Sequence, residues 1–182
     1  MILIFEGVDC VGKTTLINEI IKRQKEIITC DDDNFVLLER LRSPYVLPQN
    51  RTKETDMFSI STELTYLKAL HNKMNLILDR FHFSHYIYAL TRRGYDLNDF
   101  INNIDYELSK LHIWLFFIDA ANIIINDRLK KENDQESLKN LSKEHDLMLE
   151  MFMKTNIKHK SYMINNNEIN LNDNIERVCN II

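Results

Sequence analysis

A glycine-framed loop near the start of the chain is the feature that most constrains its fold. The chain has three glycines, and two of them, Gly7 and Gly12, enclose the pattern G-x-x-x-x-G-K-T. Glycine lets the backbone turn sharply and come close to a ligand, so that successive amide N–H groups can point at phosphate oxygens. The apolar run at residues 2–5 and the helical pattern at residues 15–26 predict a strand before this loop and a helix after it. Together they indicate a nucleoside triphosphate site.

Individual side chains of the loop have separate expected roles. We expect Lys13, exposed at the loop, to carry a positive charge to the terminal phosphates, and the Thr14 hydroxyl to bind Mg²⁺. A thiol close to a helix N-terminus should have a lowered pKa, which we expect for Cys10 unless it packs under the loop. The expected ATP-binding residues are Gly7, Val8, Asp9, Cys10, Val11, Gly12, Lys13, Thr14 and Thr15.

Length and composition favour one soluble domain over residues 1–182. A formal net charge of −4 gives no basic excess for a general nucleic-acid binder. No apolar run approaches membrane-spanning length, and we expect neither a membrane partner nor a signal peptide. The three cysteines, Cys10, Cys30 and Cys179, lack metal-ligand spacing, which suits reduced thiols in a cytoplasm.

Strand-like and helix-like segments alternate along the chain. The predicted strands, apolar nearly throughout, are residues 1–5, 35–39, 76–79, 113–119 and 161–164. The predicted helices are residues 15–26, about 57–73, 84–93, 97–111, 123–131, 136–156 and 172–182. This alternation predicts a doubly wound α/β fold with a parallel sheet covered by helices on both faces.

The segment near residues 127–137 is polar and charged and joins two predicted helices. It suits either a lid segment that closes over phosphates or a solvated helix end, and composition alone does not choose between them. The next helix places Leu138, Leu141, His145 and Met148 on one face, which favours packing over a ligand role for His145.

Asp79 and Arg80 follow the third predicted strand. The carboxyl ends of parallel strands face the ligand crevice, where an arginine can bind phosphate with two parallel N–H groups and an aspartate can orient Mg²⁺-bound water. The chain lacks the Asn-Lys-x-Asp pattern of GTP switches, because its nearest match is Asn72-Lys73-Met74-Asn75. It also lacks the length and basic channel expected of a helicase-like motor.

With these motifs the chain resembles the thymidylate kinases and their viral deoxynucleoside-monophosphate kinase relatives. The stretch IFEGVDCVGKTT is similar to the opening of that family, and DRFHFSHYIYA to its Asp-Arg-Tyr/Phe/His-x-x-Ser segment with an aromatic residue four positions on. The stretch LRSP is similar to an Arg-x-Pro after the second strand, and FFIDA to the strand before the lid. The resemblance implies a P-loop kinase sheet of five parallel strands in the order 2-3-1-4-5, and a possible homodimer.

The resemblance also implies roles for single residues. Asp9 would accept the 3′-hydroxyl of the acceptor deoxyribose, and Arg80 with Arg42 (or Arg51) would bind its monophosphate. Ser84 would support the Asp-Arg turn, and Tyr88 would contact the acceptor base. The remaining implied contacts are Tyr66 for the base, Asp79 and Thr14 for Mg²⁺, and Arg128, helped by Lys131, for the transferring phosphate.

The sequence therefore predicts an ATP- and Mg²⁺-dependent kinase that phosphorylates a deoxynucleoside monophosphate, dTMP first, with Lys13, Arg80 and Arg128 as catalytic residues. His85, Ile87 and Ala89 depart from the family pattern near the base, so another deoxynucleotide stays open. Two alternatives also stay open: a deoxynucleoside kinase acting on the 5′-hydroxyl, and a P-loop regulatory or DNA-associated module. The viral relatives leave open a virus-encoded enzyme acting in a host cytoplasm.

Overall fold

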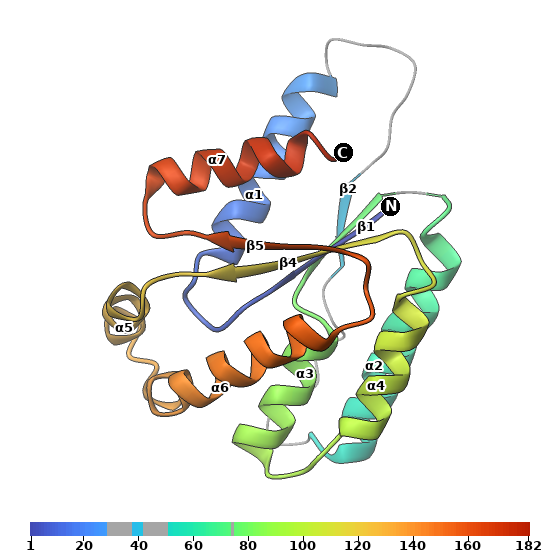
Figure 1. The fold of residues 1–182 in the computed structure, drawn as a ribbon, viewed down its shortest axis with the longest axis vertical. Coiled ribbons are helices and arrows are strands. Elements are labelled where there is room, and N and C mark those ends of the chain that lie inside the picture. Colours follow the sequence, from blue (N-terminus) through green and yellow to red (C-terminus); the bar gives the residue numbers. More distant parts are fainter. Residues whose placement is uncertain (29–37, 42–50, 74) are drawn as a thin grey trace.

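The computed structural model describes residues 1–28, 38–41, 51–73 and 75–182. Within these residues the chain forms one five-stranded parallel sheet with the strand order β2-β3-β1-β4-β5 (Figure 1). The strands are β1 (Ile2–Glu6), β2 (Leu38–Leu41), β3 (Asn75–Asp79), β4 (Ile113–Asp119) and β5 (His159–Ile164). The first part of the strand predicted at residues 35–39 lies outside the described residues.

Helices cover the sheet on both sides. They are α1 (Lys13–Ile28), α2 (Lys53–Leu70), α3 (His82–Tyr88), the π-helix η2 (Ala89–Arg93), α4 (Asn98–Leu108), α5 (Asn122–Lys131), α6 (Gln135–Lys154) and α7 (Glu168–Cys179). Helices α1 and α7 pack together on one side, and α2, α3, α4 and α6 lie on the other (Figure 1). The predicted α/β class, with a parallel sheet between helices, is confirmed. Among the described helices, none combines the length and apolar character needed to cross a membrane.

The central strands are buried as their apolar sequences predict. All five residues of β1 are buried, and β4 is buried along nearly its whole length. The rings of Phe5 and Phe116 stack between these strands with their centroids 4.9 Å apart. Strand β5 alternates exposed and buried residues because it is the edge of the sheet. The core thus fixes the strand ends where the loops begin.

Several helix ends differ from the predicted bounds because side chains cap them. The Asn167 side chain accepts a hydrogen bond from the backbone N–H of Asn170, so α7 begins at Glu168, four residues before the predicted start. A capping box between Thr52 and Thr55 begins α2 earlier than predicted. These caps depend on residues just outside the apolar pattern, which is why periodicity alone missed them.

Helix α6 buries Leu141, Met148 and Phe152, as its periodicity predicts. His145 lies on the same face against the ring of Phe117, and its Nε2 is 3.1 Å from Asp119 Oδ2. Burial alone would lower the pKa of His145, but its hydrogen bond to the Asp119 carboxylate outweighs burial and raises that pKa. His145 therefore joins α6 to the end of β4.

A buried carboxylate at the end of β1 fixes the start of α3. Glu6 has no exposed surface, and its Oε1 accepts hydrogen bonds from the backbone N–H groups of Phe81 (2.8 Å) and Phe83 (3.1 Å). Its Oε2 accepts a hydrogen bond from the Ser84 hydroxyl. A negative charge at these N–H groups stabilises the first turn of the helix. Glu6 therefore holds the chain just after Arg80 against the loop that follows β1.

We expect Glu6→Ala to lower the free energy of unfolding by about 3 kcal/mol or more, because buried backbone donors lose a charged acceptor. Glu6→Gln keeps one acceptor oxygen and should lose less, about 1–2 kcal/mol. Urea unfolding of the three proteins measures both values. A loss below about 1 kcal/mol for Glu6→Ala would show that this carboxylate does not hold the start of α3.

Candidate active site

The two loop glycines are required by the backbone and by close neighbours. Gly7 has φ 142° and Gly12 has φ 90°, conformations that other residues rarely adopt. A Cβ atom at Gly7 would lie 2.2 Å from the carbonyl oxygen of Ile118, and one at Gly12 would lie 2.4 Å from Nδ2 of Asn165. The neighbouring side chains of Val8 and Val11 are buried and anchor the loop in the core. Helix α1 begins directly after it, at Lys13.

The expectation that Lys13 is exposed is wrong. Lys13 is only 4% exposed, and its Nζ donates hydrogen bonds to the carbonyl oxygens of Gly7 (2.7 Å) and Val8 (2.6 Å). Burial, together with the nearby charge of Arg80, lowers the pKa of Lys13 to about 7. The ammonium group lies inside the curve of the loop, where an anionic ligand would stabilise its charged form.

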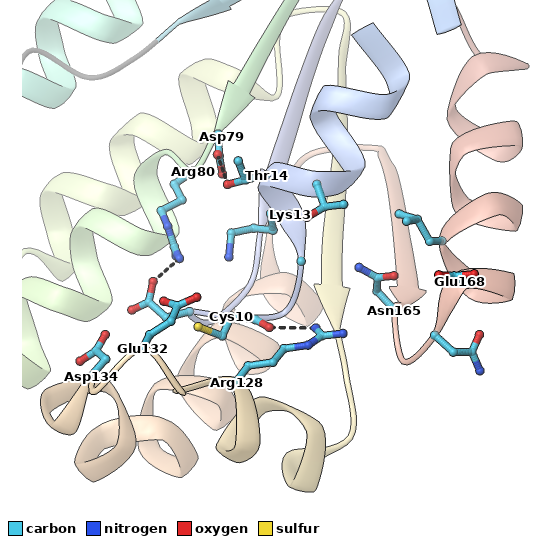
Figure 2. Close-up of a pocket in the computed structure, with 15 residues that line it drawn as sticks. Cys10, Lys13, Thr14, Asp79, Arg80, Arg128, Glu132, Asp134, Asn165 and Glu168 are labelled. Carbon is cyan, nitrogen blue, oxygen red and sulfur yellow. Dashed lines mark hydrogen bonds and ion pairs between the residues drawn. The ribbon is translucent and has the colours of Figure 1, made fainter. Parts of the chain in front are cut away.

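Asp79 and Thr14 lie side by side at the start of α1. The Thr14 hydroxyl donates a hydrogen bond to Asp79 Oδ2 at 2.9 Å, as Figure 2 shows. One hydroxyl and one carboxylate oxygen next to a phosphate-binding loop form a donor set that Mg²⁺ prefers, since it binds through a few protein oxygens and phosphates. These two residues fit a Mg²⁺ ion held partly through water.

Arg80 turns back from the end of β3 toward the loop. Its φ is 76°, in the left-handed region, and its backbone N–H donates to the Phe5 carbonyl at 2.9 Å. Its Nη1 donates to the carbonyl oxygen of Gly7 (2.9 Å) and to the hydroxyl of Tyr88 (2.7 Å). Its Nη2 pairs with Asp9. The guanidinium group therefore lies at the mouth of the loop.

Asp9 is the centre of the charged cluster. Besides Arg80, it accepts hydrogen bonds at Oδ2 from Arg92 (2.9 Å), Ser137 (2.9 Å) and Tyr88 (3.2 Å). Burial alone would raise the pKa of Asp9, but the charges of Arg80, Lys13 and Arg92 hold that pKa well below its usual range. Asp9 is therefore an ionised acceptor of hydrogen bonds and a weak base.

Arg92 is a site residue that sequence reasoning missed. Its Nε and Nη2 each lie 2.7 Å from a carboxylate oxygen of the buried Glu144 on α6, which is a bidentate pair. Its guanidinium carbon lies 4.0 Å from the centroid of the Tyr88 ring. The π-helix η2 presents Arg92 to the site, whereas the sequence only suggested the end of a helix before Gly94.

The expectation of a lowered pKa for Cys10 is also wrong. Burial raises the pKa of the thiol to about 11, and a hydrogen bond to Glu132 adds to this shift. Arg128 lies on the other side of the residue and donates from Nη1 to the Cys10 carbonyl oxygen at 2.9 Å (Figure 2). Helix α5 thus brings the cation of Arg128 to the loop, and the turn after α5 brings the carboxylate of Glu132, which opposes the thiolate.

The loop, the turn at Asp79 and Arg80, and Arg128 line a cavity of about 710 Å³. The lining residues that the sequence predicted are Asp9, Cys10, Gly12, Lys13, Thr14, Thr15, Asp79, Arg80 and Arg128. The lining residues that it did not predict are Glu132, Asp134, Asn165, Asn167, Glu168 and Leu171. Figure 2 shows Arg128 and Asn165 on the same side of the loop, and Glu132 and Asp134 toward the side where the Cys10 side chain lies. The loops after β4 and β5 form one side of the cavity, because parallel strands end at the same edge.

Other predicted residues lie away from the cavity or outside the described residues. Ser84 is buried and supports the turn through Glu6 and Arg80, since it accepts from Arg80 Nη1 at 3.3 Å. Tyr66 is 58% exposed on α2 and is not among the described lining residues. Arg42 lies outside the described residues. Arg51, the alternative to Arg42, pairs with the buried Asp56 at 3.4 Å.

We expect Cys10 to react slowly with a small alkylating reagent at pH 8, because a thiol with a pKa of about 11 is almost fully protonated. The rate should be on the order of a hundredfold below that of the same residue in the unfolded chain. Glu132→Gln should accelerate the folded-state reaction several-fold, since it removes an opposing charge. Mass spectrometry of each cysteine gives both rates, and equal rates in folded and unfolded protein would contradict the raised pKa.

The structure resembles solved nucleotide-binding proteins over its whole length. One is the YorR protein of Bacillus subtilis in complex with phosphorylated GDP, with a TM-score of 0.67 at 17% identity, covering 100% of this chain and 95% of that one. A thymidylate kinase from Ehrlichia chaffeensis has a TM-score of 0.56 at 19% identity, covering 100% and 97%. A deoxyadenosine kinase from M. mycoides with dCMP and dCDP bound has a TM-score of 0.62 at 17% identity, covering 100% of this chain and 98% of that one. At these identities the likeness shows a shared fold.

Sequence comparison identifies the family. No curated protein sequence matches the chain significantly. The sequence model of thymidylate kinase, however, matches residues 5–175, which is nearly the whole chain and includes the loop, the Asp-Arg turn and the segment between α5 and α6. The chain therefore belongs to the thymidylate kinase family, a family of nucleotide kinases.

Proposed function

We propose that the protein is an ATP- and Mg²⁺-dependent kinase that transfers the γ-phosphoryl group to a deoxynucleoside monophosphate, with dTMP as the first candidate. The observation that carries this proposal is the pairing of Asp9 with Arg80 at the mouth of the phosphate-binding loop. A carboxylate suits a sugar hydroxyl, and an adjacent guanidinium suits a phosphate. A deoxynucleoside monophosphate carries both groups.

The donor nucleotide would occupy the loop side of the cavity. Backbone N–H groups of the loop and the N-terminus of α1 would surround the β-phosphate, with Lys13 directed at the terminal phosphates. Thr14 and Asp79 would hold Mg²⁺, which would supply positive charge to the phosphates of the donor when bound. Arg128 lies at the opposite wall, near Cys10, where it would reach the transferring phosphoryl group.

The acceptor would occupy the Arg80 side. Arg80 would bind its monophosphate, and Asp9 would accept its 3′-hydroxyl. Tyr88 lies between Arg80 and Arg92 and would contact the sugar and base. The choice of thymine in particular rests on the family alone, because Tyr66 is not among the described residues that line the cavity.

The chemistry needs positioning and charge neutralisation more than proton transfer. The phosphate of the acceptor is already ionised, so its oxygen can attack without a strong base. Lys13, Arg80 and Arg128 would hold the acceptor oxygen in line with the γ-phosphorus and spread the charge that develops on the transferring group. All three cations line one cavity, which supports this arrangement.

A deoxynucleoside kinase is the second candidate, because the fold is also that of a deoxyadenosine kinase. Such an enzyme phosphorylates a hydroxyl group and gains from a carboxylate that can accept its proton. The lowered pKa of Asp9 makes it a poor base, which favours a monophosphate acceptor. Deoxynucleoside kinases typically have the sequence Glu-Arg-Ser at this position, whereas this chain has Asp79-Arg80-Phe81.

The sugar contact can be tested with dTMP and its 3′-deoxy analogue. We expect Asp9→Ala to lower kcat/KM for dTMP by roughly ten- to a hundredfold, since a hydrogen bond to a charged group is lost. The 3′-deoxy analogue should be a poor acceptor for the parent enzyme and scarcely worse for Asp9→Ala, because the contact is already absent. Asp9→Asn, which keeps the shape and one acceptor oxygen, should lie between the two.

The result that contradicts this role is a pair of losses that multiply. If Asp9 only stabilised the loop, the substitution would weaken the binding of ATP and would lower kcat/KM for both acceptors by the same factor. Measuring KM for ATP in each variant separates that case. A shared factor would remove Asp9 from the acceptor site and leave the nucleotide-binding half of the proposal.

A further inference from the structure

The Asp9 carboxylate has more hydrogen-bond donors than one of its oxygens can serve. Oδ2 accepts from Arg92 and Ser137, each at 2.9 Å, and from Tyr88 at 3.2 Å, while Oδ1 pairs with Arg80. A carboxylate oxygen offers about two lone-pair sites, so a full carboxylate serves about four donors. A ligand hydroxyl that binds Asp9 is therefore a fifth donor, and one of the present four has to bond elsewhere.

Ser137 is the donor with a second carboxylate ready. It lies in the first turn of α6, is 1% exposed, and its Oγ is 2.7 Å from Asp134 Oδ2 as well as 2.9 Å from Asp9 Oδ2. A hydroxyl group has one proton, so it can donate to only one of these two carboxylates at a time. Rotation of the hydroxyl would move the hydrogen bond from one to the other without moving the backbone.

The other three donors are held more firmly. Arg80 and Arg92 are charged, and Arg92 is further fixed by its bidentate pair with Glu144. The Tyr88 hydroxyl accepts from Arg80 at 2.7 Å and donates its own proton to Asp9 at 3.2 Å. Releasing Arg80 or Tyr88 would leave a half-buried donor without its carboxylate partner, and releasing Arg92 would separate its charge from one of its two carboxylates, which is costly in each case. The Ser137 hydroxyl can leave Asp9 at little cost.

We propose that Ser137 is a positioning residue that gives up its hydrogen bond to Asp9 when the 3′-hydroxyl of the acceptor binds, and then donates to Asp134. This step rests on the proposed function, in which Asp9 accepts that hydroxyl. The step exchanges one hydrogen bond for another. The contact with Asp9 therefore contributes less binding free energy to the acceptor than a contact with a carboxylate that has no competing donor. Ser137 therefore sets how strongly the enzyme prefers an acceptor with a 3′-hydroxyl.

The exchange also links the acceptor site to the lid segment, residues 127–137. Asp134 caps α6, since its Oδ1 accepts from the Ser137 N–H at 2.9 Å, and it lies on the wall of the cavity beside Cys10 (Figure 2). The preceding helix α5 carries Arg128, which contacts the loop. A second hydrogen bond from Ser137 to Asp134 strengthens the cap at the turn that follows Arg128. Binding of the sugar would thereby stabilise the turn next to Arg128, which is one of the proposed catalytic residues.

The test compares kcat/KM for dTMP with kcat/KM for its 3′-deoxy analogue in one protein at a time. Their ratio isolates the 3′-hydroxyl, because effects on ATP, on the lid or on folded fraction act on both acceptors. We expect Ser137→Ala to raise this ratio by about two- to tenfold, since the 3′-hydroxyl then meets an acceptor site with no competing hydroxyl. Ser137→Thr keeps the hydroxyl and should keep the ratio of the parent enzyme.

Asp134→Asn provides the opposite change. An asparagine keeps the oxygen that caps α6 but presents N–H groups to the Ser137 oxygen, so Ser137 has Asp9 as its remaining carboxylate acceptor. The 3′-hydroxyl then displaces a donor that has lost its alternative, and the ratio should fall by about two- to tenfold. A general loss of stability would not move the ratio in opposite directions in two neighbouring variants.

An unchanged ratio in Ser137→Ala or in Asp134→Asn would overturn the exchange while leaving the acceptor role of Asp9 in place. The parent enzyme distinguishes this from failure of the proposed function. If the parent shows no preference for the 3′-hydroxyl, Asp9 does not contact the sugar, and the exchange is excluded together with that contact. Opposite shifts in the two variants, with the parent ratio restored by Ser137→Thr, support the exchange.

Discussion

The ion pair between Asp9 and Arg80 is the interaction on which the rest of the site depends. It joins the phosphate-binding loop after β1 to the turn after β3, two segments that lie 71 residues apart in the chain. Arg80 reaches it from a left-handed backbone conformation, and Glu6 holds the following residues through their backbone N–H groups. The sheet brings the two strand ends together, and the ion pair turns that proximity into a defined binding geometry.

The charges of the site are balanced only in part without a ligand. Lys13, Arg80 and Arg92 surround Asp9. The ammonium group of Lys13 donates hydrogen bonds to two backbone carbonyl oxygens, and burial lowers its pKa to about 7. Buried cations are costly unless opposite charges satisfy them. Phosphate groups supply such charges, so nucleotide binding should raise the pKa of Lys13 and complete the cluster. Lys13 and Arg80 therefore offer local positive charge to phosphate groups, although the chain as a whole carries a net charge of −4.

The parts of the structure that follow from local sequence were predictable. The glycine spacing predicts the loop, and the apolar runs predict the strands whose ends place Asp79 and Arg80. The burial of Lys13 and the raised pKa of Cys10 were not predictable, because they depend on how the folded backbone and distant elements surround these side chains. Lys13 is buried by its own loop, and Cys10 is opposed by Glu132 from the turn after α5.

Arg92 and Ser137 carry no sequence signal of their own. An arginine before a glycine at a helix end is ordinarily a surface residue, and a serine in the first turn of a helix is ordinarily a cap. The packing of α3 and η2 against α6 brings both to Asp9. Tyr66, which family likeness suggested as a contact for the base, is 58% exposed on α2 and is not among the described residues that line the cavity.

Phosphorus-31 NMR of the reaction products tests most directly whether the acceptor is a phosphate or a hydroxyl group. The protein is mixed with ATP, Mg²⁺ and either dTMP or thymidine, and the spectrum identifies each new phosphorus species. We expect dTDP to form in step with ADP when dTMP is supplied, and no phosphorylation of thymidine. Formation of dTMP from thymidine, without dTDP from dTMP, would contradict a site in which Arg80 binds an acceptor phosphate.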